Sequence, residues 1–228
     1  MSARYAVFFC PEDSTPLALY GERVLGRTAI GETVPATEDD YPDRTLAASY
    51  AATPAHYGFH ATLKAPFHLR EGKSEDALLR AVDALAQRQS PIVMHSLEPR
   101  MMSGFASLLF ADQPESVKHL SSECVEQLEE FRAPLTAEDI QRRNPEALSK
   151  MQQCYLHQYG YPFVMSEFQF HMTLTGSRDS TMDAEYFSWL SSLYSRLVTS
   201  PPLLDRLAVF WQTDRTSRFV RLAQFPFN

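Results

Sequence analysis

The sequence of 228 residues contains no apolar run near the length of about 18 residues that a membrane-spanning helix needs. The stretch MSARYAVFFCPEDS at its start also lacks a long apolar segment followed by a small-residue cleavage site. Together these two absences predict a cytoplasmic protein that does not enter a membrane.

Cysteine is scarce, with only Cys10, Cys124 and Cys154 along the chain. Three widely separated cysteines exclude a disulfide framework and a Cys-x-x-Cys metal site. We expect each of them to pack as a small buried hydrophobic side chain rather than to act as a nucleophile.

Positive charge is also in short supply, because 21 Lys and Arg residues face 28 Asp and Glu residues, a formal net charge of -7. Long nucleic-acid interfaces depend on many cationic contacts to phosphates. The composition therefore disfavours nucleic acid as a partner, and it leaves room for a small anionic substrate held by a few local donors.

What the sequence does contain is enough apolar material, 44% of its residues, to bury the core of one large domain or two small lobes. Apolar periodicity and capping residues predict helices at 15–26, 74–85, 117–131 and 183–198, with further helical segments after Thr136 and around 148–155. Short runs rich in aromatic and β-branched residues predict strands at 4–10, 57–69, 91–97, 104–111, 167–176, 205–212 and 218–225. The region 28–55 reads as a long surface loop with a helical turn at 44–50, and it is a candidate cover for a cleft.

The two halves of the chain share one order of elements: a strand with a histidine, a helix, then two strands. This repetition predicts an internal duplication with extra helices inserted between the copies. We therefore expect an α+β, bilobal fold with two mainly antiparallel sheets and flanking helices around a central cleft. It would be one domain, 1–228, with pseudo-symmetric lobes at about 1–112 and 113–228.

Two short motifs carry the chemistry of this prediction. The first reads Phe-His-Ala-Thr-Leu and contains His60 and Thr62, and the second reads Phe-His-Met-Thr-Leu and contains His171 and Thr173. Because alternate side chains of a strand face opposite sides, each motif places its histidine and threonine on one face and apolar residues on the other. A single motif of this kind arises easily by chance, whereas two copies at matching places in a duplicated order indicate a site.

Two imidazoles, with an ordinary pKa of about 6.5, can divide the roles of general base and general acid at neutral pH. Two hydroxyl groups beside them can donate hydrogen bonds to phosphate oxygens and stabilise the charge of the transition state. This combination suits hydrolysis of a compact cyclic phosphodiester without a metal ion or another cofactor.

The paired motifs resemble those of the 2H phosphoesterase superfamily. The stretches RYAVFFCP, YGFHATLKAPF, FRAPLTAEDIQRR, YGYPFVMSEFQFHMTLTG and RFVRLAQFPF resemble the branch of that superfamily encoded in bacterial phosphonate-utilisation operons, beside the carbon-phosphorus lyase system. The resemblance implies a bilobal α+β fold with the motifs facing each other across a cleft. It also implies His60 and His171 as the catalytic pair, Thr62 and Thr173 as phosphate-binding residues, and a small phosphorylated substrate, a phosphonate-derived cyclic sugar phosphate.

Two other functions fit the same motifs: hydrolysis of RNA ends with 2',3'-cyclic phosphates, and binding of a phosphorylated metabolite without catalysis. Several further residues stand near the motifs without a defined role. Lys64 would lie on the polar face of the first strand, and His56, His60 and His68 raise the question of a metal site, for which the sequence supplies no nearby carboxylate or cysteine. Candidates for packing or for stacking on a substrate are Tyr5, Tyr57, Tyr161 and Trp211.

Overall fold

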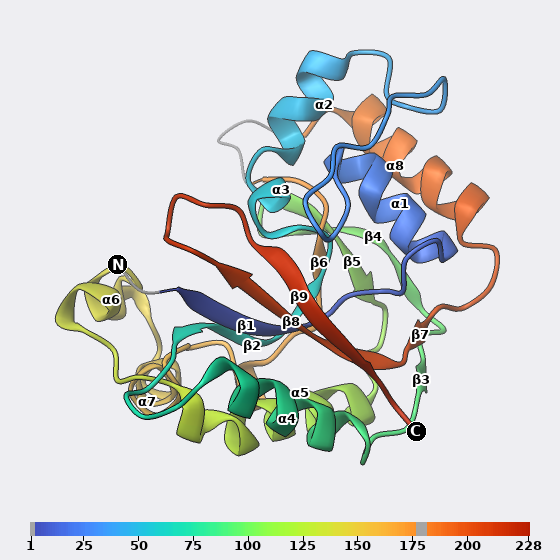
Figure 1. Ribbon diagram of the computed structural model, residues 1–228. Helices are drawn as coiled ribbons and strands as arrows, with labels where there is room; N and C mark the ends of the chain where they lie inside the picture. The colour runs from blue at the N-terminus through green and yellow to red at the C-terminus, as the bar shows by residue number, and fades with distance from the viewer. Residues whose placement is uncertain (1–2, 177–181) are drawn as a thin grey trace.

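The computed structural model describes residues 3–176 and 182–228 and is a mixed α+β structure, as the sequence predicts (Figure 1). Its strands are β1 (Arg4–Phe9), β2 (Ala61–His68), β3 (Ile92–Val93), β4 (Leu97–Met102), β5 (Phe105–Phe110), β6 (Met172–Thr173), β7 (Leu203–Leu204), β8 (Arg206–Gln212) and β9 (Val220–Pro226). Its α-helices are α1 (Pro16–Leu25), α2 (Arg44–Ala51), α3 (Pro54–Tyr57), α4 (Glu75–Ala86), α5 (Glu115–Gln127), α6 (Ala137–Gln141), α7 (Lys150–Tyr159) and α8 (Ala184–Leu197). Short 3-10 helices lie at Glu129–Phe131, Pro145–Ala147 and Met165–Glu167.

The strands form a seven-stranded antiparallel sheet in the order β4-β5-β6-β2-β1-β8-β9 and a two-stranded sheet of β3 and β7. Strands from the two halves of the chain alternate across the large sheet: β6 lies between β5 and β2, and β8 pairs with β1. The halves 1–112 and 113–228 therefore share this one sheet, and their arrangement as two pseudo-symmetric lobes stays a prediction. Within the described residues, no helix is long and apolar enough to cross a membrane.

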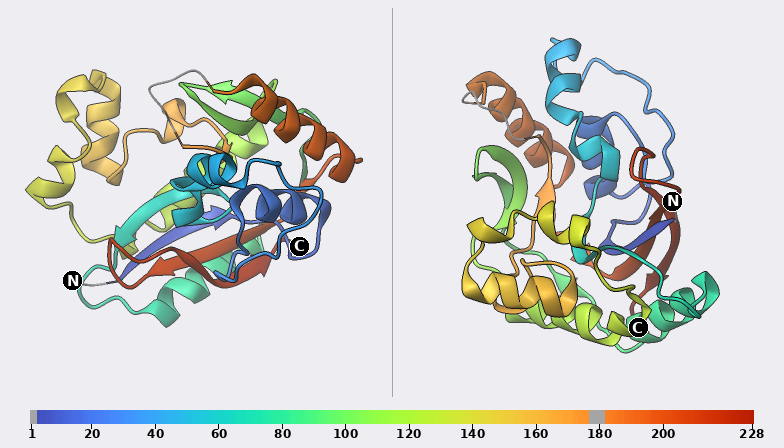
Figure 2. Two further views of the ribbon diagram at one scale, coloured as in Figure 1. Left: turned by 90° about the horizontal axis from the view of Figure 1, so that it is seen from above. Right: turned by 90° about the vertical axis from the view of Figure 1, so that its left-hand side faces the viewer.

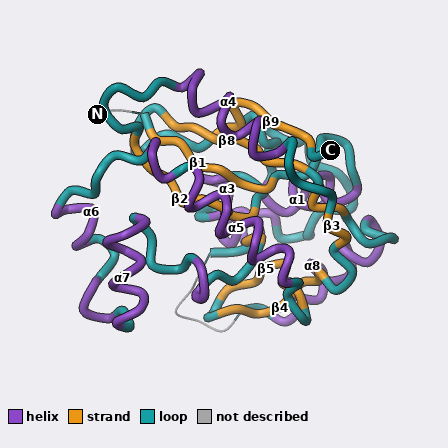
Figure 3. The backbone as a smooth tube through the Cα atoms, turned by 90° about the horizontal axis from the view of Figure 1, so that it is seen from below, coloured by secondary structure: helices purple, strands orange, loops and turns teal. Residues whose placement is uncertain are grey.

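Helices cover the large sheet on both sides. Helix α4 packs on β8 and β9, and α5 packs on β2, so that both lie against one face, as the view from below shows (Figure 3). On the other side α1 packs against α8 and α2, and α8 packs against β4 (Figures 1 and 2). The side chains of β1 alternate accordingly, with Val7 and Phe9 in the main core and Ala6 and Phe8 in a second, smaller core cluster.

The predicted helix starts are confirmed by their caps. The side chains of Thr15, Ser74 and Asp183 each accept hydrogen bonds from backbone N–H groups of the first turn that follows. Thr136 and Asp139 form the predicted capping box of α6. These local signals are reliable because they satisfy backbone donors that have no partner within the helix.

Two strand predictions need correction. The strand predicted at 91–97 is much shorter, because only Ile92 and Val93 form β3, which pairs with β7, while Leu97 begins β4 and β4 pairs with β5 across a tight turn at Ser103 and Gly104, both with positive φ. The second motif is not one long strand either, because a 3-10 helix occupies Met165–Glu167 and only Met172 and Thr173 join the sheet. The turn at 44–50 is confirmed as α2.

Candidate active site

The two histidine motifs lie on neighbouring strands at the centre of the large sheet. Strands β2 and β6 are antiparallel, and Ala61 is directly opposite Met172. Continued by one residue in each direction, this register places His60 beside Thr173 and Thr62 beside His171. The two histidines are then diagonal neighbours, which in an antiparallel pair stand about 7–8 Å apart.

All four polar side chains of the motifs face the same side of the sheet. Ala61 and Met172 are both fully buried in the main core, so the residues on either side of each point the opposite way. Phe8 of β1 is directly opposite Thr62 and belongs to the smaller core cluster on that opposite side. The arrangement has an approximate twofold axis at the Ala61–Met172 pair.

The two imidazole rings are held in the same way. Nδ1 of His60 lies 2.8 Å from the carbonyl oxygen of Gly58, and Nδ1 of His171 lies 2.8 Å from that of Gln169. Since a carbonyl oxygen only accepts, Nδ1 carries the proton in both rings, and Nε2 of a neutral ring is free to accept one. Nε2 of His60 lies 3.3 Å from Oγ1 of Thr62, whose hydroxyl can donate to it.

The surroundings of His60 are more apolar than those expected for a solvated histidine. The ring of Phe8 stacks on it with centroids 3.8 Å apart, and the ring of Phe210 lies at 6.4 Å. Desolvation lowers the pKa of His60 to about 4; the bond to Gly58 opposes this shift, and the charge of His171 adds to it. His60 is therefore neutral at pH 7, with Nε2 available as a base.

A cavity of about 460 Å³, here called the histidine cavity, opens beside the motifs. Thr62 and His171 line it together with an aromatic wall formed by Phe105, Tyr161, Phe163 and Phe168. A wall of this kind suits the apolar face of a sugar or base next to a polar phosphate group. Residues 28–55, the candidate cover of the cleft, do not line this cavity. They are bonded elsewhere: Trp189 of α8 donates to the carbonyl of Asp39, and the backbone N–H of Gly176 donates to the carbonyl of Tyr50.

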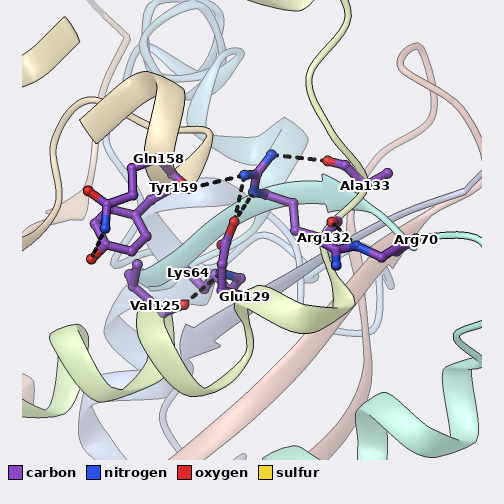
Figure 4. A network of polar contacts seen from close by, with 8 residues as sticks. All are labelled: Lys64, Arg70, Val125, Glu129, Arg132, Ala133, Gln158 and Tyr159. Atoms are coloured by element: carbon purple, nitrogen blue, oxygen red, sulfur yellow. Dashed lines mark hydrogen bonds and ion pairs between the residues drawn. The ribbon is translucent and has the colours of Figure 1, made fainter. Parts of the chain in front are cut away.

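The expected position of Lys64 on the polar face is wrong. A β-bulge in the pairing of β1 with β2 makes Val7 the partner of Lys64 and Phe8 the partner of Thr62, so the alternation shifts by one residue. The Lys64 side chain is only 3% exposed and lies on the side covered by α5. Its Nζ donates to the carbonyl of Val125 and to Glu129, each at 2.9 Å (Figure 4). It is a buried structural ion pair and not a phosphate ligand.

The four aromatic candidates separate into two pairs. Tyr5 donates to Glu75 of α4 and lies opposite Trp211 in the sheet, so both belong to the side away from the histidines. Tyr57 lies 6.1 Å from His60 between ring centroids, and Tyr161 lines the histidine cavity. Only Tyr57 and Tyr161 are thus placed to contact a substrate.

The histidines near the first motif do not converge. His60 immediately precedes β2, whereas His68 ends it, opposite Arg4, and Nδ1 of His68 donates to the carbonyl oxygen of Ala3 at 3.0 Å. Nε2 of His56 lies 3.5 Å from the side-chain amide of Gln212. Among the residues that the structure describes, no group of three His, Cys, Asp or Glu side chains could hold a metal ion. Of the cysteines, Cys10 and Cys124 are buried as expected, but Cys154 is exposed.

Residues that the sequence interpretation did not single out also border the site. Phe8 stacks on His60, a contact that no local pattern reveals because it depends on the register of β1 and β2. A second cavity, of about 340 Å³, adjoins Tyr57 and has five arginines in its lining: Arg4, Arg132, Arg142, Arg143 and Arg215. The pair Arg142–Arg143 was a visible signal in the sequence, but its three distant companions were not.

Comparison with known proteins adds a family and several relatives. Residues 62–220 match a family described as "Protein of unknown function (DUF1045)". The chain is 33% identical to ribose 1,5-bisphosphate phosphokinase PhnN of Janthinobacterium sp. (strain Marseille) over 99% of its own length and 51% of that protein. It is 30% identical to the protein of the same name from Laribacter hongkongensis (strain HLHK9) over 82% of its own length and 43% of that protein. The chain thus spans about half the length of these curated relatives.

Among solved structures, the chain is similar to E. coli LigT in complex with 3'-AMP, with a TM-score of 0.44, 13% identity, and coverage of 100% of this chain and 99% of that chain. It is also similar to a structure described as a phosphoesterase, with a TM-score of 0.44, 11% identity, and coverage of 99% and 98%.

Proposed function

We propose that this chain, which belongs to the family described as "Protein of unknown function (DUF1045)", is a metal-independent phosphoesterase that hydrolyses a small cyclic phosphodiester. The observation that carries the proposal is the antiparallel pairing of the two His-x-Thr motifs about Ala61 and Met172. It brings two imidazoles and two hydroxyls to one face of the sheet with the histidines diagonally opposed. The four side chains thus stand at the corners of a square, with the histidines at opposite corners. A phosphate group bound over the centre of this square would have one histidine on either side of it.

The environments of the two histidines support different roles. A general acid must be protonated before it acts, and with a pKa of about 4 only about one His60 ring in a thousand is protonated at pH 7. His60 is therefore the general base, and its Nε2 takes a proton from the attacking water. His171 lies on the more exposed side of the site and acts in its imidazolium form: it gives the Nε2 proton to the leaving oxygen and keeps the Nδ1 proton, which is held by the carbonyl of Gln169.

Thr62 and Thr173 would hold the phosphate. In the free protein the Thr62 hydroxyl is directed toward Nε2 of His60 at 3.3 Å. When substrate binds, the same hydroxyl can turn and donate to a non-bridging oxygen, which also frees Nε2 of His60 for water. Hydrogen bonds to charged groups contribute about 1.5–3 kcal/mol, so replacing either threonine by valine should lower kcat/KM by about 10- to 100-fold.

The substrate that fits best is a cyclic phosphate on a phosphorylated sugar. The name of the curated relatives refers to a ribose bisphosphate, which supports a ribose-based substrate, and the link to phosphonate breakdown rests on the sequence resemblance. The kinase activity in that name is not carried over. Gly72, Lys73 and Ser74 look like the end of a phosphate-binding loop, but Phe67 stands where such a loop has its first glycine.

The test is hydrolysis of small cyclic phosphodiesters, including ribose 1,2-cyclic phosphate and nucleoside 2',3'-cyclic phosphates, in the presence of EDTA. His60→Ala and His171→Ala should each lower kcat by about 10²–10⁴-fold. His119→Ala is the matched control, since the His119 side chain is 73% exposed on α5, outside the site, and it should keep wild-type activity and melting temperature. Full activity in both site variants, or activity that EDTA abolishes, contradicts the proposal. Substrate binding without turnover by the wild type would instead identify a binding protein.

A further inference from the structure

The second cavity, here called the arginine cavity, is strongly cationic although the chain as a whole is acidic. Asp139 is the one carboxylate among its lining residues, against five guanidinium groups. A concentration of one charge in a hollow of about 340 Å³ raises the local concentration of ligands of opposite charge.

Three of the five arginines already have carboxylate partners. These pairs are Arg132 with Glu129, Arg142 with Glu138 and Arg215 with Asp139. Neither of the other two, Arg4 and Arg143, forms an ion pair with any carboxylate in the described part of the chain.

Arg4 is the more deeply buried of these two arginines that lack a carboxylate partner among the described residues. It is 9% exposed, and its Nε donates to the side-chain oxygen of Gln212 at 2.7 Å, while its guanidinium carbon lies 5.5 Å from the centre of the Phe219 ring. Burial lowers the pKa of Arg4, and the nearby charges of Arg215 and Arg143 lower it further. A buried cation among other cations is costly unless an anion neutralises it.

The arginine cavity is adjacent to the histidine cavity. The Arg143 guanidinium lies 4.9 Å from the centre of the Tyr161 ring, and Tyr161 lines the histidine cavity. Tyr57 lines the arginine cavity, and its ring centroid is 6.1 Å from that of His60. Arg143 therefore contacts a ring of the histidine-cavity wall, and Tyr57 borders the arginine cavity close to His60, so these two tyrosines connect the arginine cavity with the histidine motifs.

We infer that the arginine cavity binds a second phosphate group of the substrate, a terminal phosphomonoester, while the histidines act on the cyclic diester. This inference rests on the proposed function for the diester. The planar guanidinium groups match the oxygens of a phosphomonoester and hold it more tightly than a neutral group. The preferred substrate is therefore a cyclic phosphodiester that carries a further phosphate at the other end of its sugar.

Calorimetry tests the cavity without relying on turnover, with ribose 5-phosphate and ribose as probes. The wild type should bind ribose 5-phosphate and not ribose. Arg143→Gln should weaken this binding about tenfold or more. Arg143 is exposed, so the variant should fold, whereas Arg4 is buried in β1 and its replacement risks the fold. Arg80→Gln on α4 makes the same change of charge outside the cavity and should bind like the wild type. Equal binding of both probes, or equal affinity of the two variants, overturns the inference.

Turnover separates this inference from the proposed function. Nucleoside 2',3'-cyclic phosphates with and without a 5'-phosphate form a matched pair, and the wild type should favour the 5'-phosphorylated member by about tenfold or more in kcat/KM, a preference that Arg143→Gln removes. Hydrolysis of both diesters with no preference refutes phosphate binding in the arginine cavity and leaves the proposed phosphoesterase activity standing. If ribose 5-phosphate binding depends on Arg143 but neither diester is hydrolysed, the proposed phosphoesterase activity is refuted and phosphate binding in the arginine cavity is supported.

Discussion

The ion pair between Lys64 and Glu129 offers a sharp test of the claim that Lys64 serves the fold and not the site. The perturbation is Glu129→Gln, which keeps the size of the side chain and removes the carboxylate charge that pairs with Lys64 and also with Arg132. Lys64 is 3% exposed and Glu129 is 23% exposed. Removing one partner of a buried pair costs about 3–5 kcal/mol. Because Glu129 is partly exposed and the carbonyl of Val125 remains as an acceptor, we expect the free energy of unfolding to fall by about 2–4 kcal/mol.

The pH dependence of this loss has a defined sign. Burial lowers the pKa of Lys64, and Glu129 opposes that shift, so the variant lowers the pKa further. Between the folded and unfolded pKa values the unfolded chain binds more protons, and stability rises with pH. The deficit of Glu129→Gln should therefore be largest near pH 7 and shrink toward pH 10.

Urea denaturation at pH 7 and at pH 9.5 measures both effects, and Glu130→Gln is the matched control. Glu130 pairs with Lys73, but its side chain is 59% exposed, so its loss should cost at most about 1 kcal/mol. Per folded molecule, Glu130→Gln should hydrolyse cyclic diesters at the wild-type rate, and Glu129→Gln should do so for cyclic diesters without a second phosphate, because its other partner, Arg132, lines the arginine cavity and not the histidine cavity. If Glu129→Gln is within about 0.5 kcal/mol of the wild type, or loses hydrolysis while keeping its stability, the reasoning from burial is refuted.

Three further predictions concern the pH-dependent stability contributed by His60, the packing of Gly21 against Phe59, and the reactivity of the cysteine thiols. Since the folded pKa of His60 is about 4 and its ordinary value is 6.5, the wild type should lose about 2 kcal/mol more stability than His60→Gln as the pH falls from 7 to 4 in urea titrations, after allowance for partial exposure of the ring. Gly21→Ala should lower stability by about 1–3 kcal/mol in urea denaturation, because an added Cβ would lie 2.0 Å from the Phe59 ring, next to His60 in the chain. A thiol reagent should modify Cys154 rapidly in the native protein and Cys10 and Cys124 only after unfolding; burial raises the pKa of Cys10 to about 11, which suppresses its thiolate form.

Helix boundaries were predictable from the sequence because their determinants are local. Thr15, Ser74 and Asp183 each cap the helix that follows within three residues. Alternation also placed His60 and Thr62 together correctly, since a regular strand has a strict period of two. Prediction worked wherever the relevant partner stands a few positions away in the chain.

Features that depend on pairing between distant segments were not predictable in this way. Lys64 lies on the opposite face of β2 from the one predicted, because a bulge in the pairing with β1 shifts the alternation of side chains. That bulge depends on contacts between residues some 60 positions apart in the sequence. The mixing of strands from both halves in one sheet has the same origin, since only the final pairing decides that β6 joins β2. The arginine cavity likewise unites residues from the first strand, the middle of the chain and the loop after β8.

The duplicated motifs fix the positions of the chemical groups, and their surroundings distinguish the groups from one another. About the Ala61–Met172 pair the two histidines are equivalent, each with Nδ1 held by the carbonyl two residues earlier. They differ because β1 supplies Phe8 to only one of them, and this stacked ring removes His60 from water and keeps it neutral. Under the proposed function, replacing Phe8 would therefore alter the assignment of base and acid without touching either motif, so the proposed roles follow from the fold around the motifs and not from the motifs themselves.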